Sequence, residues 1–226
     1  MKKLLVGFIS AFLAGHSLAE EVTATMGFTT DYRSLGASQT AGEPAIQGSL
    51  DVAFDNGVYA GLWGSNVNYG DDANLELDYY LGYSGAVNDS LSYAADIAYF
   101  QSPGYSYDGN YFYYEFYGYY DALSLSYTYA DSYFNSGKSS HLVTVDYAIP
   151  LPKELSLNLH AGRNMGDYWD EDSGLGEYND YSVGVSGAFH GLDIAVDYVM
   201  NDSDFHYDEG VSRNDNHFVL TVSRTM

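Results

Sequence analysis

The segment from Leu75 to Tyr83 reads LELDYYLGY, and its side chains alternate between two chemistries. Successive side chains of a β-strand point to opposite faces. In a strand, the leucines and two of the tyrosines would share one face, whereas Glu76, Asp78 and Tyr80 would share the other. Alternation of this length is typical of a strand and not of a helix. The segment therefore predicts a strand with one apolar and one hydrophilic face.

The same two-residue period recurs along most of the chain, and no segment after the first twenty residues repeats with the period of a helix. Three further runs can be registered either way, so there we predict strands without assigning their faces. The clear runs lie near residues 22–31, 46–54, 91–100, 123–129, 155–160, 181–189, 192–198 and 218–222, and the ambiguous ones near 58–67, 110–120 and 141–149. Together with residues 75–83, these runs predict roughly twelve strands of about ten residues.

The connections between the runs alternate between short and long. Short ones contain Asp55-Asn56-Gly57 and His190-Gly191, whose Gly and Asn supply backbone dihedrals that other residues resist. Long ones lie near residues 34–44, 69–74, 102–109, 131–140, 166–179 and 201–215. Short periplasmic turns and longer extracellular loops are typical of outer-membrane barrels. The sequence therefore predicts an all-β fold, a single antiparallel up-and-down transmembrane β-barrel of about 12 strands.

The first residues have the pattern of a secretory signal peptide. Lys2 and Lys3 precede an apolar stretch too short to span a bilayer, and the small residues Ser17 and Ala19 stand before the expected cleavage site. The alternative is a buried N-terminal helix, but nothing after Glu20 continues a helical period. We therefore predict a signal peptide over residues 1–19 and an outer-membrane barrel domain over residues 20–226.

Tyrosine content bears on whether the apolar face meets lipid or the interior of a soluble exported sheet. Mean hydropathy does not decide, because lipid-facing and lumen-facing residues cancel in a membrane barrel. The chain has 25 Tyr against 11 Phe, and tyrosine suits headgroup belts and wet pore walls better than a dry core. Residues 111–120 are aromatic on both faces, as a lipid girdle outside and stacking inside would explain; an aromatic patch in a soluble sheet is the alternative. We predict the outer membrane of a Gram-negative bacterium.

Charge and cysteine content restrict the partners. The formal net charge is −23, and nucleic acid is excluded because no basic patch exists to replace its counterions. Without cysteine, an exported chain has no disulfides. The expected partners are outer-membrane lipid, lipopolysaccharide, the barrel-assembly machinery, and small solutes or ions. That machinery usually recognises a terminal aromatic residue, whereas this chain ends in Met226. We expect this difference to affect the efficiency of assembly more than the fold.

Four segments of the first strands resemble the TorF porin family. They are TDYRSLGASQT from Thr30 to Thr40, PAIQGSLD from Pro44 to Asp51, YAGLWGSNV from Tyr59 to Val67 and ELDYYLGY from Glu76 to Tyr83. The similarity is strongest there and extends over the mature chain. It implies an outer-membrane barrel of uncertain physiological role, and it carries no catalytic or ligand residues to transfer.

The hydrophilic strand faces carry carboxylates that would line the lumen. Unpaired carboxylates are costly to bury in protein, which favours a wet lumen, and a negative wall favours cations over anions. We predict a porin-like channel for passive passage of small hydrophilic solutes, with a preference for cations. A partly plugged barrel, and acids that merely pair with nearby Tyr and Arg, are the alternatives. The candidate pore-lining residues are Asp31, Asp51, Glu76, Asp78, Tyr80, Asp96, Asp193 and Asp197, with Arg33 and Arg163 as cations near the outer end.

Other functions have weaker support. We expect no enzyme, because the mature chain has no Gly-x-Ser-x-Gly, no His-x-Ser and no HExxH. We expect no cofactor and no dedicated metal site, although the acidic segments 167–172 and 202–209 offer oxygen ligands without EF-hand spacing. The alternative function is a non-conducting structural or adhesive barrel that acts through its acidic extracellular loops, with Tyr168, Trp169 and Phe205 as contacts.

Overall fold

The computed structural model describes residues 21–170, 176–203 and 215–226, which form a closed antiparallel β-barrel. Each strand pairs with the next one along the chain, and β1 pairs with both β4 and β14, which closes the wall. The twelve strands of the barrel are β1 (Glu21–Thr29), β4 (Ala45–Ala53), β5 (Val58–Asn66), β6 (Leu75–Ala86), β7 (Leu91–Gln101), β8 (Tyr111–Tyr120), β9 (Leu123–Ala130), β10 (Ser140–Pro150), β11 (Leu155–Met165), β12 (Tyr178–Phe189), β13 (Leu192–Asn201) and β14 (His217–Thr225). The predicted fold and strand number are confirmed, whereas the predicted signal peptide lies outside the described residues.

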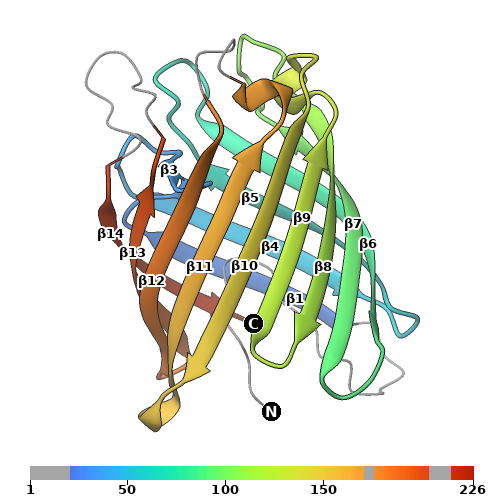
Figure 1. The fold of residues 1–226 in the computed structure, drawn as a ribbon, viewed down its shortest axis with the longest axis vertical. Helices are drawn as coiled ribbons and strands as arrows, with labels where there is room; N and C mark the ends of the chain where they lie inside the picture. Colours follow the sequence, from blue (N-terminus) through green and yellow to red (C-terminus); the bar gives the residue numbers. More distant parts are fainter. Residues whose placement is uncertain (1–20, 171–175, 204–214) are drawn as a thin grey trace.

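The long and short connections gather at opposite ends of the barrel (Figure 1). Short turns join β4 to β5, β6 to β7, β8 to β9, β10 to β11 and β12 to β13. Gly57 and Gly191 take positive φ angles of 88° and 80° in two of them, which explains the glycines there. Single turns of 3₁₀ helix interrupt three connections: η1 (Tyr133–Asn135), η2 (Pro152–Glu154) and η3 (Asp167–Trp169).

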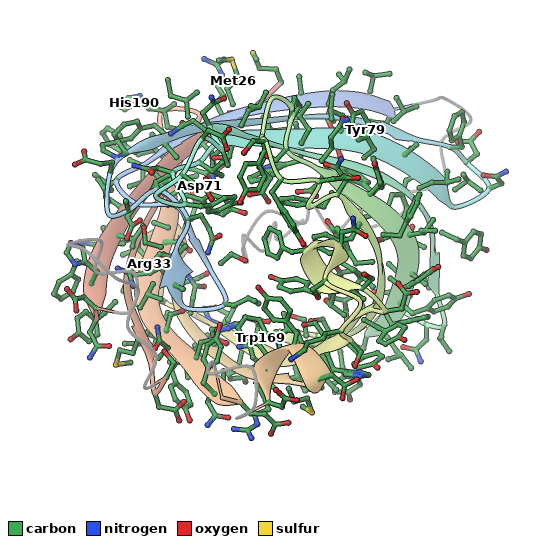
Figure 2. The ribbon with its side chains drawn as sticks, turned by 90° about the horizontal axis from the view of Figure 1, so that it is seen from above. Met26, Arg33, Asp71, Tyr79, Trp169 and His190 are labelled. Carbon is green, nitrogen blue, oxygen red and sulfur yellow. The ribbon has the colours of Figure 1, made fainter. Side chains whose placement is uncertain are left out.

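The outer surface of the barrel is apolar. Met26, Ile46 and Phe218 are 61%, 66% and 68% exposed, and Figure 2 shows Met26 pointing away from the ring of strands. Large apolar side chains at alternate positions of every barrel strand except β5 share this exposure, as a lipid-facing wall requires. Among the described residues, no helix is long and apolar enough to cross a membrane.

Contacts with other strands show which residues point inward on the three strands whose faces the sequence leaves open. On β8, Glu115 lies directly opposite Asp96 of β7, so the odd-numbered residues of β8 face inward. On β5, Tyr59 donates a hydrogen bond to Asp96, which sets its odd-numbered residues inward too. On β10, Asp146 lies opposite His160 of β11, so its even-numbered residues face inward. Strand β8 therefore carries aromatic rings on both faces, one outside and one inside the barrel.

The long connection between β1 and β4 turns into the mouth of the barrel. It contains a small hairpin of β2 (Arg33–Ser34) and β3 (Ala37–Ser38), and Figure 2 shows it inside the ring of strands, with Arg33 on it. At its tip, the carbonyl of Gly36 accepts a hydrogen bond from Asn201 Nδ2 at 3.0 Å. The sequence predicted a long loop here but gave no direction for it.

Candidate functional site: the lumen and its mouth

One side of the inner wall is acidic. Asp96 and Glu115 lie directly opposite each other on neighbouring strands, and Glu76 and Asp78 follow two residues apart on β6. Like charges directly opposite each other destabilise a sheet unless they are solvated or hydrogen-bonded. We call the inward-facing Asp51, Glu76, Asp78, Asp96 and Glu115 of β4, β6, β7 and β8 the acidic arc.

Tyrosines supply most of the hydrogen bonds to the acidic arc. Tyr59 donates to Asp96 Oδ2 at 2.6 Å, and Tyr80 donates to Asp51 Oδ1. Glu76 accepts from two loop tyrosines, Tyr32 at 3.1 Å and Tyr69 at 3.0 Å. Burial raises the pKa of both loop phenols, so they stay protonated and act as donors. These donors orient the carboxylates and add no positive charge to the wall.

Glycines opposite the tyrosines let the rings lie along the wall. A Cβ atom on Gly82 would stand 2.4 Å from Tyr59 Cζ and 2.7 Å from Asp96 Cβ. A Cβ atom on Gly61 would stand 2.4 Å from Tyr80 Oη, in the same way. Each tyrosine therefore crosses a glycine strand to reach a carboxylate on the strand beyond it, and it does not project toward the barrel axis.

The opposite side of the wall holds a second polar cluster. His160 lies between two carboxylates, with Nδ1 2.6 Å from Asp146 Oδ1 and Nε2 2.8 Å from Asp180 Oδ1. Asn164, which is fully buried, donates to Asp180 Oδ2 at 3.0 Å. Alternation along β11 puts His160 on the inward face, whereas the facing of Asp146 depends on the register of β10 with β11.

Asp31 and Arg33 belong to the inturned loop and hold it together. Arg33 Nε donates to Asp31 Oδ2 at 2.6 Å, and their side chains are only 5% and 2% exposed. Asp31 also accepts from Ser38 at 2.5 Å and from Thr40 at 3.2 Å. Because these groups satisfy one another, the pair stabilises the loop at the mouth.

The predicted lumen position of Arg163 is wrong. Arg163 shares a face of β11 with the outward Leu157 and Leu159, its side chain is 40% exposed, and its Nη2 lies 2.6 Å from Glu177 Oε2. Near the end of a strand, an outward side chain leaves the apolar belt and can carry charge. Of the other candidates, Asp51, Glu76, Asp78, Tyr80, Asp96, Asp193 and Asp197 lie on inward faces.

Two neighbouring cavities lie at the loop end of the barrel. The outer one, of about 310 Å³, is lined mainly by aromatic rings, and the inner one, of about 200 Å³, reaches Glu76, Asp78 and Glu115. Both are bordered by the inturned loop, η1 and the connection between β5 and β6. The shared lining residues are Ser34, Leu35, Gln39, Tyr69, Tyr133 and Phe134. The inturned loop and η1 therefore both border the approach from the loop end to the acidic arc.

The described residues contain no group of three His, Asp or Glu side chains placed to hold a metal ion. The two acidic segments considered as oxygen-ligand sources lie partly outside the described residues. The absence of a metal and of a cofactor therefore stays a prediction.

Comparisons with known proteins agree with the barrel. A solved structure of the NanC porin superposes with a TM-score of 0.56 at 11% identity, over 91% of this chain and 98% of that one. The KdgM porin gives 0.55 at 11% identity, over 90% and 97%, and a KdgM structure described as a complex with disordered oligogalacturonate gives 0.54 at 10%, over 90% and 96%. At these identities the likeness shows the fold alone. No curated protein matches the sequence, but the family model described as "Bacterial protein of unknown function (Gcw_chp)" matches residues 14–226.

Proposed function

This chain belongs to the Gcw_chp family of bacterial proteins of unknown function, and we propose that it is an outer-membrane channel for passive passage of small hydrophilic solutes, with a preference for cations. The observation that carries the proposal is the acidic arc inside a closed barrel whose outer face is apolar. An apolar exterior suits lipid and a hydrophilic interior suits water.

The charge of the lumen supports the preference for cations. Asp78 Oδ1 and Asp96 Oδ1 are buried and have no hydrogen-bond partner among the described protein groups. Buried polar atoms normally have a partner, so these two oxygens leave the acidic arc with unsatisfied acceptors. Oligogalacturonate carries a carboxylate on each sugar residue. The acidic arc would repel such an anion, so the solute proposed here differs in charge from the ligand named for the KdgM structure.

Several finer expectations are part of the proposal. They are a signal peptide over residues 1–19, membership of the TorF family, assembly by the barrel-assembly machinery and contact with lipopolysaccharide. An adhesive barrel has less support, because Trp169 is only 5% exposed and donates from Nε1 to Ser140 Oγ at 2.8 Å. Tyr168 is half-buried, and Phe205, the third proposed adhesive ring, lies outside the described residues.

Neutralising two lumen carboxylates should reduce ion selectivity. We expect purified wild-type protein in planar bilayers to show a cation-selective reversal potential under a salt gradient, and Asp78→Asn with Asp96→Asn to move that potential toward zero. The matched control is Asp89→Asn with Asp121→Asn, which removes the same charge from exposed short turns. An unchanged potential in the lumen variant would contradict the preference. A folded wild-type barrel that passes no current would favour the non-conducting alternative.

A further inference from the structure

The outer cavity has a composition that the channel proposal does not by itself require. We call it the aromatic vestibule, and its rings come from separate parts of the chain: Tyr69, Tyr105 and Tyr107, Tyr133 and Phe134 of η1, Tyr168 and Trp169 of η3, and Tyr178 of β12. Six of the eight rings are tyrosines, whose hydroxyls can bond water, but water and small ions do not need the apolar ring faces. An aromatic lining indicates a solute that has apolar surface of its own.

The vestibule is preformed by contacts among its rings. The ring centroids of Tyr133 and Tyr168 lie 4.8 Å apart and those of Tyr168 and Trp169 lie 4.9 Å apart, both edge to face. Trp169 in turn meets Tyr178 of the barrel wall at 5.3 Å, and Leu35 of the inturned loop packs against this cluster. Rings held in this way keep their positions in the absence of a ligand, which lowers the entropic cost of binding.

Polar groups line the same cavity beside the rings. Ser34, Gln39, Ser136 and Asp71 contribute hydroxyl, amide and carboxylate groups. A sugar ring complements a lining of aromatic and polar groups, because it has a face of C–H bonds and an edge of hydroxyls. The C–H face can lie on the negative face of an aromatic ring, and the hydroxyls can bond to the polar groups. About 310 Å³ is at the small end of ligand sites, so it suits a short saccharide.

The charge of the lining narrows the class of saccharide. Neither cavity has Lys or Arg among its lining residues, and the inner one presents Glu76, Asp78 and Glu115. An acidic sugar would therefore meet only like charge on its way inward. We propose that the aromatic vestibule binds an uncharged saccharide before it passes into the lumen, an inference that rests on the proposed channel function.

Two vestibule tyrosines allow a test that leaves the barrel wall intact. Tyr105 and Tyr107 lie on the connection between β7 and β8, with ring centroids 6.0 Å apart, and Tyr107 is 51% exposed. We expect maltotriose, added from the loop side, to interrupt the single-channel current in a concentration-dependent way. Tyr105→Ala with Tyr107→Ala should raise the half-blocking concentration about tenfold, because stacking area is lost. The control Tyr120→Ala removes a 58% exposed ring from the outward face of β8 and should leave blockade unchanged.

Charged probes and a binding measurement separate the outcomes. Trigalacturonate should interrupt the current far less than maltotriose, and choline, a cation that rings also bind, should do so less as well. Equal or stronger blockade by either, or blockade unaffected by the double substitution, would overturn the inference. If the wild type passes no current, the channel proposal fails, and maltotriose titration of tryptophan fluorescence in detergent still tests the vestibule. A Trp63→Phe background leaves Trp169 as the one tryptophan of the chain, and no change of its fluorescence in that titration would overturn the inference.

Discussion

The Gly36→Val variant is expected to carry a larger single-channel current than the wild-type protein. Gly36 has a φ of +73°, and a Cβ atom there would stand 2.6 Å from Asp180 Cβ and 3.0 Å from Asn201 Cβ. A side chain in this left-handed conformation costs about 1–2 kcal/mol even without a clash. The tip of the inturned loop could then no longer seat against β12 and β13, and the mouth should widen. Conductance in planar bilayers, with the passage of larger neutral solutes, measures the effect.

A second glycine of the same loop provides the control. Gly42 has a φ of +80°, but no atom lies within 4 Å of the position that its Cβ would occupy. Gly42→Val therefore imposes similar backbone strain without the collision with the wall. We expect its conductance to stay near the wild-type value. An equal rise in both variants would mean that seating of the tip does not restrict the mouth.

The Gly82→Leu variant is expected to lose both stability and conductance. Its side chain would occupy the space through which Tyr59 reaches Asp96. Overpacking of this kind costs about 1–3 kcal/mol, and a displaced Tyr59 ring must move toward the barrel axis. A folded barrel migrates as a compact band on a gel when the sample is not boiled. Samples heated before electrophoresis should lose this band at a lower temperature than the wild type, and the current through barrels that remain folded should be smaller.

Gly118→Leu is the matched change for this experiment. Gly118 also lies within a barrel strand, but it faces outward and its Cβ would meet no atom within 4 Å. We expect the unfolding temperature and the conductance of this variant to stay near the wild-type values, because lipid tolerates an added apolar group. If Gly82→Leu has the same unfolding temperature and conductance as Gly118→Leu, the inner wall can accommodate a side chain at residue 82 without displacing Tyr59, and the prediction is wrong.

The period of the sequence predicts the fold because it reflects the difference between two solvents. Wherever one face alone is apolar, as from Leu75 to Tyr83, the alternation gives the facing directly. The error at Arg163 has a physical cause: its charge suggests the lumen, whereas strict alternation from Leu155 puts it outward. Charge indicates the inner face only in the part of a strand that lies within the apolar belt.

Other features could not be obtained from the sequence pattern. Glu115 lies in a segment with rings on both faces, and only its pairing with Asp96 of β7 shows that it points inward. The register between strands depends on the whole closed wall and not on any single segment. The direction of the loop that carries Gly36 likewise depends on contacts with Asn201, which is distant in sequence.

The glycines of the inner wall separate the width of the lumen from the number of strands. In a barrel whose inward side chains all stand upright, strand number fixes the free bore. Here Gly61 and Gly82 allow bulky phenols to lie tangentially, and Gly162 and Gly184 make similar room for Asp180 and Asp197. Single changes between glycine and a larger residue could thus resize the passage step by step, while the hydrogen-bonded cylinder itself stays the same.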